Sequence, residues 1–235
     1  MKLLILAGGY GTRLRNILKE TPKALAPIHD KPFLWYQIKN WRKQGLCEFV
    51  FLLHYGSEQI IEFINKIKKT TLKGCKIDFV IEKKPLLTGG AIGNAVQELG
   101  LEKSFLVVNA DTWLGDGISL LSKKRINSLF VIMHNDIRRY GEVVFDKNFY
   151  ISSLREKSSL KKSGWINTGL YKLDPRIFST WNGDAISLEK IILPNMIKKR
   201  LIKAVPLQAD FIDIGIEDDY IKFCSWQKNN RKNKL

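Results

Sequence analysis

Cysteine is scarce in the 235-residue sequence, which contains only Cys47, Cys75 and Cys224. The number is odd and no pair has CxxC spacing, so the sequence predicts neither a disulfide framework nor a zinc site. Sparse cysteine of this kind is typical of cytoplasmic proteins, and we expect the protein in the cytoplasm. No apolar stretch approaches the ~20 residues of a membrane-spanning helix, so we expect no membrane partner. The apolar start, residues 1–7, is too short for a secretory signal and is interpreted as a buried strand.

Acidic residues are in deficit as well, because 23 Asp and Glu face 39 Lys and Arg and leave a formal net charge of +16. A positive field attracts phosphorylated metabolites, nucleic acid or anionic membranes, and charge alone does not choose among them. Nucleic-acid binding would predict clustered arginine with exposed aromatic residues. The basic residues here are mostly scattered lysines on expected helix faces, such as 66–69 and 198–200. We therefore expect small phosphorylated partners and no nucleic acid.

The apolar residues, 45% of the sequence, suffice for a sizeable core and follow two periodicities. In the first half they predict strands at residues 2–7, 48–53, 76–81 and 105–108 and helices at 31–44, 57–69 and 89–98. Alternating strands and helices predict an α/β fold with a mostly parallel sheet covered on both faces. Ligands of such sheets bind beyond the carboxyl ends of the strands, so the chemistry is expected in the loops there.

The second half has shorter strand-like runs and no visible domain boundary. Strands are expected at 128–134, 141–146, 149–156 and 166–173, helices at 175–180, 187–200 and 217–227, and an extended stretch at 202–213. A single domain is therefore expected over residues 1–227. Residues 228–235 are polar and basic and are expected to form a frayed tail.

The first expected strand is followed by Gly8-Gly9-Tyr10-Gly11-Thr12-Arg13-Leu14 and then by Pro22-Lys23. Glycines let the backbone approach a phosphate and turn its N–H groups toward it. Arg13 adds a planar, permanently charged fork for phosphate oxygens, and Lys23 adds a point charge. The spacing fits neither the P-loop nor the GxGxxG of dinucleotide folds. A tight turn without a ligand is the structural alternative.

This segment resembles the signature of the sugar nucleotidyltransferases, GGxGTRL followed by PKxLxPI. The resemblance extends to about residue 227 and implies a Rossmann-like three-layer α/β/α nucleotidyltransferase fold with a mostly parallel mixed central sheet. It implies an enzyme that joins a nucleoside triphosphate to a sugar 1-phosphate and releases pyrophosphate. Residues 1–134 would mainly bind the nucleotide and residues 135–227 mainly the sugar phosphate. The implied nucleotide ligands here are Leu6 and Ala7 beside the base, Gly8, Gly9, Gly11, Thr12 and Arg13 around the triphosphate, and Lys23 at the reacting phosphates.

The segment from Glu82 through Ala91, EKKPLLTGGA, follows an expected strand and opens an expected helix. A glycine-bearing helix amino end can press its backbone against a base or an anion. The segment resembles the family's base-recognition motif, which implies that Glu82, Thr88, Gly89 and Gly90 bind the nucleotide, although Leu87 stands where glycine is usual. A carboxylate accepts two hydrogen bonds and guanine offers two adjacent donors, so Glu82 favours GTP. An exposed Glu82 beside two lysines is the alternative.

Two aspartates are candidate metal ligands. Asp111 follows an apolar run, and Asp213 lies between apolar residues before a glycine turn. An acid at the carboxyl end of a strand can hold a metal beside phosphates, and a buried carboxylate needs a cation or donor. Both resemble the family's metal-binding aspartates, which implies an Mg²⁺ ion held by Asp111 and Asp213, with Asp111 also touching the nucleotide. Ala110 and Glu217 depart from the family's usual glycine and proline.

The resemblance also implies a sugar-phosphate site. Its members would be Gly141 against the sugar ring, Glu156 on the hydroxyls, Lys157 on the phosphate, and Asn167 and Thr168 completing the pocket. The three histidines form no catalytic pattern and are interpreted as structural.

The implied reaction needs no general base, since its nucleophile is already a phosphate anion. Catalysis should then consist of alignment and charge neutralisation, with Arg13 and Lys23 as catalytic residues beside Mg²⁺.

Details of the motifs, including KALAPI at 23–28 and FIDIGI at 211–216, resemble the D-glycero-α-D-manno-heptose 1-phosphate guanylyltransferases, which serve surface polysaccharide such as capsule. The alternatives are a hexose 1-phosphate uridylyl-, thymidylyl-, cytidylyl- or guanylyltransferase, and an inactive nucleotidyltransferase-like binding or regulatory module. A homodimer is left open.

Overall fold

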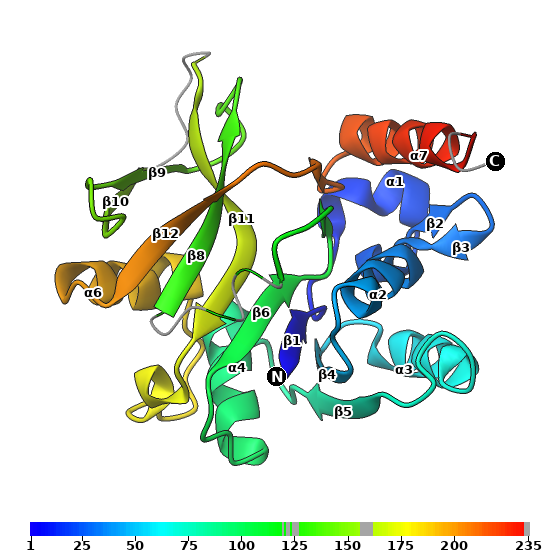
Figure 1. Cartoon of the computed structure of the whole chain (residues 1–235). Coiled ribbons are helices and arrows are strands. Elements are labelled where there is room, and N and C mark those ends of the chain that lie inside the picture. Colours follow the sequence, from blue (N-terminus) through cyan, green and yellow to red (C-terminus); the bar gives the residue numbers. More distant parts are fainter. Residues whose placement is uncertain (119, 121–122, 124–126, 156–161, 233–235) are drawn as a thin grey trace.

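One mixed sheet runs through the chain, and its N-terminal part is parallel (Figure 1). The computed structural model describes residues 1–118, 120, 123, 127–155 and 162–232. The parallel strands are β1 (Leu3–Leu6), β4 (Glu48–Leu53), β5 (Lys76–Ile81) and β6 (Phe105–Asn109). β1 lies between β4 and β6, and β5 pairs with the outer side of β4. β1, β4 and β6 are almost entirely apolar and buried, because both faces of a parallel sheet are covered.

Helices cover both faces of this sheet. The α-helices in the described residues are α1 (Arg15–Leu18), α2 (Phe33–Lys43), α3 (Ser57–Ile67), α4 (Leu87–Glu98), α6 (Leu193–Lys198) and α7 (Glu217–Lys232), of which α2 and α4 illustrate the two faces. Successive β1 residues point to opposite faces: Leu4 packs in one core cluster with Ile92 of α4, whereas Leu3 and Ile5 pack in another with Ile38 of α2. The expected three-layer α/β/α fold with a mixed sheet is thereby confirmed.

The second half of the chain extends the same sheet with mostly antiparallel pairings. Its strands are β8 (Asn127–His134), β9 (Glu142–Phe145), β10 (Ile151–Arg155), β11 (Gly164–Leu173) and β12 (Ile202–Leu207). β11 is the junction, since it pairs antiparallel with β6, β8 and β9, while β12 runs parallel to β8. The β8–β11 register shifts between Asn167 and Tyr171, a bulge in which Gly169 adopts a φ of 73°.

Two short ribbons and α7 close one end of the molecule. The ribbons pair β2 (Pro27–Ile28) with β3 (Lys31–Pro32), and β7 (Thr112–Leu114) with β13 (Phe211–Asp213). Phe223 of α7 is fully buried against Phe33 and Trp113, in a cluster that also contains Ile214. This packing anchors the segment that follows β13 over the sheet edge where the glycine loop emerges.

Several expected elements differ in detail. Residues 175–180 form only a 3-10 turn, Pro175–Phe178, and the helix expected over 187–200 is split into a π-helix, Leu188–Ile192, followed by α6. Pro194 in the first turn of α6 has no N–H to donate to a preceding carbonyl, which accounts for the break. The stretch 202–213 divides between β12 and β13, and α7 continues to Lys232 past its expected end at 227. No helix in the described part of the chain combines the length and apolar character that crossing a bilayer requires.

Candidate active site

A cleft of about 230 Å³ opens at the carboxyl ends of β1 and β6. The glycine loop of the first motif meets Lys23 and Asp111 there, which are the predicted phosphate and metal ligands. The lining residues are Leu6, Ala7, Gly9, Gly11, Thr12, Arg13, Lys23, Ala24, Ala110, Asp111 and Gly215. Arg13 stands on the 3-10 turn Thr12–Leu14 and is exposed, so its guanidinium is accessible from the cleft. The structure therefore brings together most of the residues predicted for the phosphate end of a nucleotide.

The glycine loop needs its glycines at two positions for steric reasons. A Cβ on Gly8 would lie 3.1 Å from His54 Cβ, which is tighter than ordinary packing. Gly11 has a φ of 60°, and a Cβ there would lie 3.2 Å from Lys23 Cβ. The loop thus passes close to both β4 and Lys23, which fixes it at the cleft.

Lys23 lies between the two predicted metal ligands. Its Nζ donates to Asp111 Oδ2 at 2.6 Å and lies 3.9 Å from Asp213 Oδ1, and its side chain is only 13% exposed. The β7–β13 ribbon brings the carboxylates together, because Asp213 pairs with Thr112, the neighbour of Asp111. The Ile214 N–H also donates to the Asp111 carbonyl at 3.0 Å. Two aspartates that are distant in the sequence are therefore neighbours, and Asp111 lines the cleft together with Gly215, whose N–H donates to Asp213.

The surroundings of Asp213 destabilise the charged form of its carboxyl group. Burial and the neighbouring Asp111 raise its pKa, while Lys23, a hydrogen bond from the Gly215 N–H and Arg139 act in the opposite direction. Two close carboxylates in a partly buried site favour binding of a cation. In the described residues no cluster of three or more His, Cys, Asp or Glu side chains is assembled. The donor set thus fits Mg²⁺, which commonly takes one or two carboxylates and completes its shell with phosphate oxygens and water.

Glu82 follows β5 and begins the predicted base segment, outside the cleft lining described above. Its Oε2 accepts a hydrogen bond from the Leu86 N–H at 2.9 Å, and burial raises its pKa. Its carbonyl oxygen lies 3.1 Å from His54 Nδ1, and His54 Nε2 lies 3.2 Å from the Tyr10 hydroxyl. A polar chain therefore links Glu82 to the glycine loop through His54.

The glycines at the amino end of α4 are used for packing in this structure. The N–H groups of Gly89 and Gly90 both donate to the Ile186 carbonyl, at 2.9 and 3.0 Å. A Cβ on Gly89 would lie 2.6 Å from Ile192 Cδ1, and one on Gly90 would lie 3.0 Å from the Asp184 carbonyl oxygen. In this structure the 184–192 segment satisfies these N–H groups. Their contribution to nucleotide binding otherwise stays a prediction.

Thr88 and Leu87 complete this segment. The Thr88 hydroxyl donates to Glu189 Oε2 at 2.7 Å and accepts from the Leu188 N–H at 2.9 Å. Leu87 stands where glycine is usual in the sugar nucleotidyltransferase motif that this segment resembles. It adopts a φ of 61°, in the left-handed region. The local backbone therefore keeps a glycine-like conformation despite the leucine, at a cost in strain.

The predicted sugar-side residues that the structure describes lie around β9 and β11. Gly141 precedes β9, where a Cβ would lie 3.1 Å from the Arg155 carbonyl oxygen. Asn167 donates to the Tyr171 hydroxyl at 2.6 Å and accepts from the Gly169 N–H. Thr168 is 3% exposed and its hydroxyl donates to the Phe130 carbonyl. The predicted Glu156 and Lys157 lie outside the described residues.

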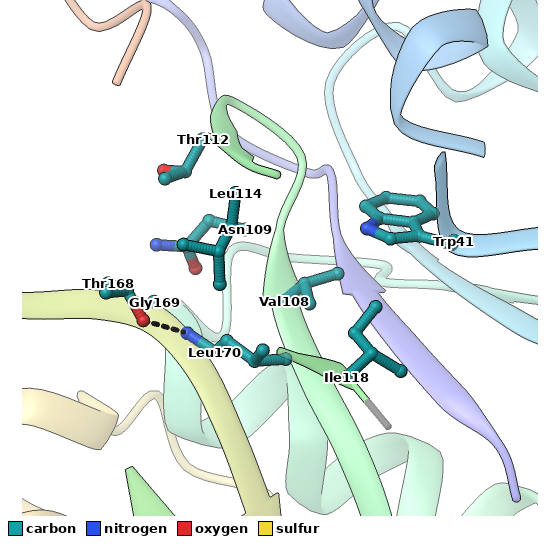
Figure 2. Close-up of a pocket in the computed structure, with 9 residues that line it drawn as sticks. All are labelled: Trp41, Val108, Asn109, Thr112, Leu114, Ile118, Thr168, Gly169 and Leu170. Atoms are coloured by element: carbon teal, nitrogen blue, oxygen red, sulfur yellow. Dashed lines mark hydrogen bonds between the residues drawn. The ribbon is translucent and has the colours of Figure 1, made fainter. Parts of the chain in front are cut away.

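Thr168 faces the interior rather than an open cleft. Figure 2 shows it beside Gly169 and Leu170 around a small internal cavity of about 10 Å³, with Asn109 across from it. That space is too small for a sugar. The Thr168 side chain is hydrogen-bonded at the β11 bulge, and its part in the sugar-phosphate pocket stays a prediction.

Comparison with known proteins decides the family. Residues 2–225 match the model described as nucleotidyl transferase. The chain belongs to the nucleotidyl transferase family.

The family members most informative here cover nearly the whole chain. A D-glycero-alpha-D-manno-heptose 1-phosphate guanylyltransferase of Campylobacter jejuni is 37% identical over 95% of this chain and 98% of its own. A protein of the same name from Aneurinibacillus thermoaerophilus is 31% identical over 94% and 96%. The crystal structure of HddC from Yersinia pseudotuberculosis complexed with GMP-PN is 33% identical over 95% of this chain and 98% of that one, with a TM-score of 0.82.

Some residues of this nucleotidyl transferase that lie around the predicted site carried no motif in the sequence. His54 was interpreted as structural, yet it joins the glycine loop to Glu82. Glu189 contacts Thr88 from a part of the sequence without a motif. Arg139 and Asp219 form an ion pair that links α7 to the segment before β9, beside Tyr140, whose pKa burial raises to about 12. The position of His54 after an expected strand had indicated a pocket-lining role as the alternative to the structural one, whereas Glu189 and Arg139 lacked such a signal.

Proposed function

We propose that this nucleotidyl transferase transfers GMP from GTP to D-glycero-α-D-manno-heptose 1-phosphate, producing GDP-heptose and pyrophosphate. The observation that carries the proposal is the convergence of Lys23, Asp111 and Asp213 at the cleft that the glycine loop lines. The substrates are those named for the relatives in Campylobacter and Aneurinibacillus, and the neighbour with bound GMP-PN supports a guanine nucleotide. We propose surface polysaccharide, such as capsule, as the destination and the cytoplasm as the location.

The chemistry follows from the charges at the cleft. The attacking group is a phosphate oxygen that is already ionised, so the barrier is repulsion between two anions rather than removal of a proton. Asp111 and Asp213 would hold Mg²⁺, which neutralises phosphate charge when it is bound. Lys23 adds a cation with little solvent around it, where its field is strong. Arg13 would neutralise the departing pyrophosphate through its planar fork.

We propose a division of labour within a single domain spanning 1–227. Residues 1–134 would mainly bind the nucleotide, with Glu82 accepting two hydrogen bonds from the guanine edge. To do so its carboxylate must be ionised, although burial raises its pKa. Residues 135–227 would mainly bind the sugar phosphate, through Gly141, Glu156, Lys157 and Asn167.

A substrate panel tests the proposal. Purified protein with Mg²⁺ is supplied with GTP, UTP, CTP or dTTP, and with heptose, mannose or glucose 1-phosphate, and pyrophosphate release is measured. We expect the largest kcat/KM for GTP with the heptose 1-phosphate. A preference for a hexose 1-phosphate would replace the sugar assignment. Tight GTP binding with no turnover of any pair would instead support a binding module.

A further inference from the structure

Two adjacent residues of the β8–β9 connection contact the segment that carries Asp213. The Tyr140 ring meets the Phe211 ring edge-on, with 5.6 Å between the centroids, and Phe211 lies two residues before Asp213. Arg139 forms an ion pair through Nη1 with Oδ2 of Asp219, which lies six residues after Asp213. The predicted metal-ligand segment is therefore contacted on both sides of its carboxylate by one dipeptide.

The β8–β9 connection is itself packed against the sugar-side strands. Ile137 is fully buried in a cluster with Ile132 of β8 and Ile166 of β11. Its carbonyl accepts from the Tyr140 N–H at 2.9 Å, which closes a turn. The predicted sugar-side residue Gly141 follows this turn directly, so the position of the turn sets the position of Gly141.

Asp219 provides an anchored partner on the other side. It lies in the first turn of α7, where the helix dipole favours a carboxylate. Phe223, one turn further along, is fully buried in the aromatic cluster, and the Tyr220 hydroxyl donates to the Pro27 carbonyl. The first turns of α7 are therefore held against the N-terminal half of the chain, and Arg139 connects the sugar-side turn to them.

The neighbouring arginine makes a different kind of ion pair. Arg138 binds Asp136 through Nε and Nη2 at 2.6–3.0 Å, and its side chain is 51% exposed. That pair lies within a single connection. The pair of Arg139 with Asp219 joins two elements instead, and the Asp219 side chain is only 16% exposed. Water screens the second pair less than the first, so its geometry is held more firmly.

The proposed reaction depends on the distance between the sugar-side turn and the Asp213 segment. The sugar phosphate would be bound beside the first and the Mg²⁺ by the second, and a misplacement of about 1 Å can cost about 100-fold in rate. The two segments are distant in the sequence, so tertiary contacts must fix their separation. A charge-assisted hydrogen bond between them is suited to that task, because it is short and directional.

We propose that Arg139, through its ion pair with Asp219, is a positioning residue that holds the sugar-side turn in register with the Asp213 segment. This inference rests on the proposed function for its kinetic readout. Arg139 is not counted among the catalytic residues, because it acts through Asp219 on one side and through the placement of Gly141 on the other.

The kinetic test compares Arg139→Ala and Arg139→Lys with a matched control, Arg138→Ala, from the same connection. For Arg139→Ala we expect kcat to fall by roughly 10- to 100-fold and the KM for the sugar phosphate to rise. The Kd for the nucleotide without Mg²⁺ should change by less than about threefold, since the glycine loop is not altered. Arg139→Lys keeps the cation and should recover part of kcat, and Arg138→Ala should match the wild type.

A double-mutant cycle tests whether Arg139 acts through Asp219. Asp219→Ala alone should lower kcat about as much as Arg139→Ala does. The variant that carries both substitutions should lose no more than either single variant, because each already removes the same connection. Losses that multiply would show that the two side chains act independently and would overturn the proposal.

Hydrogen exchange supplies a readout that needs neither substrate nor metal. Arg139→Ala should speed amide exchange in both 135–145 and 211–220, whereas Arg138→Ala should leave 211–220 unchanged. If Arg139→Ala does not fold, Arg139→Gln takes its place, since it removes the charge and keeps most of the side-chain length. Wild-type kcat and KM in Arg139→Ala, or unchanged exchange in 211–220, would overturn the proposal.

Failure of the proposed function would be seen separately, in the wild type. The kinetics use whichever substrate pair the wild type turns over, so a different sugar or base leaves the comparison of variants intact. If the wild type turns over no pair, hydrogen exchange alone decides whether Arg139 holds the two segments in register.

Discussion

The molecule contains two glycine-bearing segments at its predicted nucleotide site, and it uses them in opposite ways. In the loop after β1, Gly9 lines the cleft and a Cβ placed on it would meet nothing within 4 Å. At the amino end of α4, a Cβ on Gly89 would collide with Ile192 and with backbone atoms of Ile186 and Leu188. The first segment leaves space for a ligand, and the second is already filled by the protein itself.

The difference extends to the polar groups. Around the glycine loop, Arg13 is exposed to the cleft and Lys23 is shared between two carboxylates. At the amino end of α4, the Gly89 and Gly90 N–H groups and the Thr88 hydroxyl all have partners in 186–189. The same residue type therefore indicates either ligand approach or close packing, and only the surroundings distinguish them. Charge in the cleft should control rate, whereas substitutions at α4 should first change stability.

The largest effect is expected at Asp213. Asp213→Asn should lower kcat by about 10³-fold, because the Mg²⁺ that would neutralise the reacting phosphates loses one of its two carboxylate ligands. Stability should stay level or increase, since the substitution removes a buried charge that Asp111 repels. Pyrophosphate release and thermal unfolding measure the two quantities. A large fall in Tm with retained kcat would mean that Asp213 is structural and would break the contrast between the two segments.

Arg13 tests the same side of the comparison with a residue that is exposed. Arg13→Ala should lower kcat by on the order of 10²–10³ while leaving the Tm unchanged, since the side chain contributes little packing. Arg13→Lys should recover only part of the rate, because an ammonium lacks the planar fork. An unchanged kcat in Arg13→Ala would remove Arg13 from the catalytic residues.

A matched pair of glycine substitutions sharpens the comparison directly. Gly89→Ala should destabilise the protein by about 1–3 kcal/mol, because the added methyl overpacks against backbone that cannot move away. Gly9→Ala should leave the free energy of unfolding nearly unchanged but weaken GTP binding, because the methyl enters the cleft. Denaturant unfolding and nucleotide titration give the two values. The reverse pattern would show that the two segments have been assigned the wrong way round.

The meeting of the glycine loop and Asp111 at one cleft could be predicted from the sequence for a topological reason. The glycine loop follows β1 and Asp111 follows β6, and adjacent parallel strands deliver such loops to the same edge of a sheet. Asp213 was predicted through its motif, and 202–213 was expected to be extended, but the pairing of β13 with β7 that brings Asp213 to Asp111 was not predicted.

The partner of α4 could not be predicted in the same way. The segment 184–192 has no glycine or catalytic motif, its π-turn breaks the helical period, and Pro194 divides the expected helix. The hydrogen bonds of Gly89, Gly90 and Thr88 are made with this segment, which is distant from them in the sequence. Propensity and spacing describe what lies near in sequence, so they could not tell packing from ligand binding at these positions.

The smallest effect is expected at Leu87, a residue of the α4 segment whose φ is close to that of Gly11 in the loop after β1. Its φ of 61° is a conformation that glycine adopts freely, and its side chain is 57% exposed, so little packing is lost on truncation. Leu87→Gly should therefore raise the free energy of unfolding by about 1 kcal/mol, the strain released minus the entropy that glycine adds to the unfolded chain. For a chain of this size that corresponds to a Tm increase of about 2–4 °C. Leu87→Ala is the control, since alanine keeps the strain and should gain nothing. Equal stability of the glycine and alanine variants would show that the left-handed conformation costs nothing at this position.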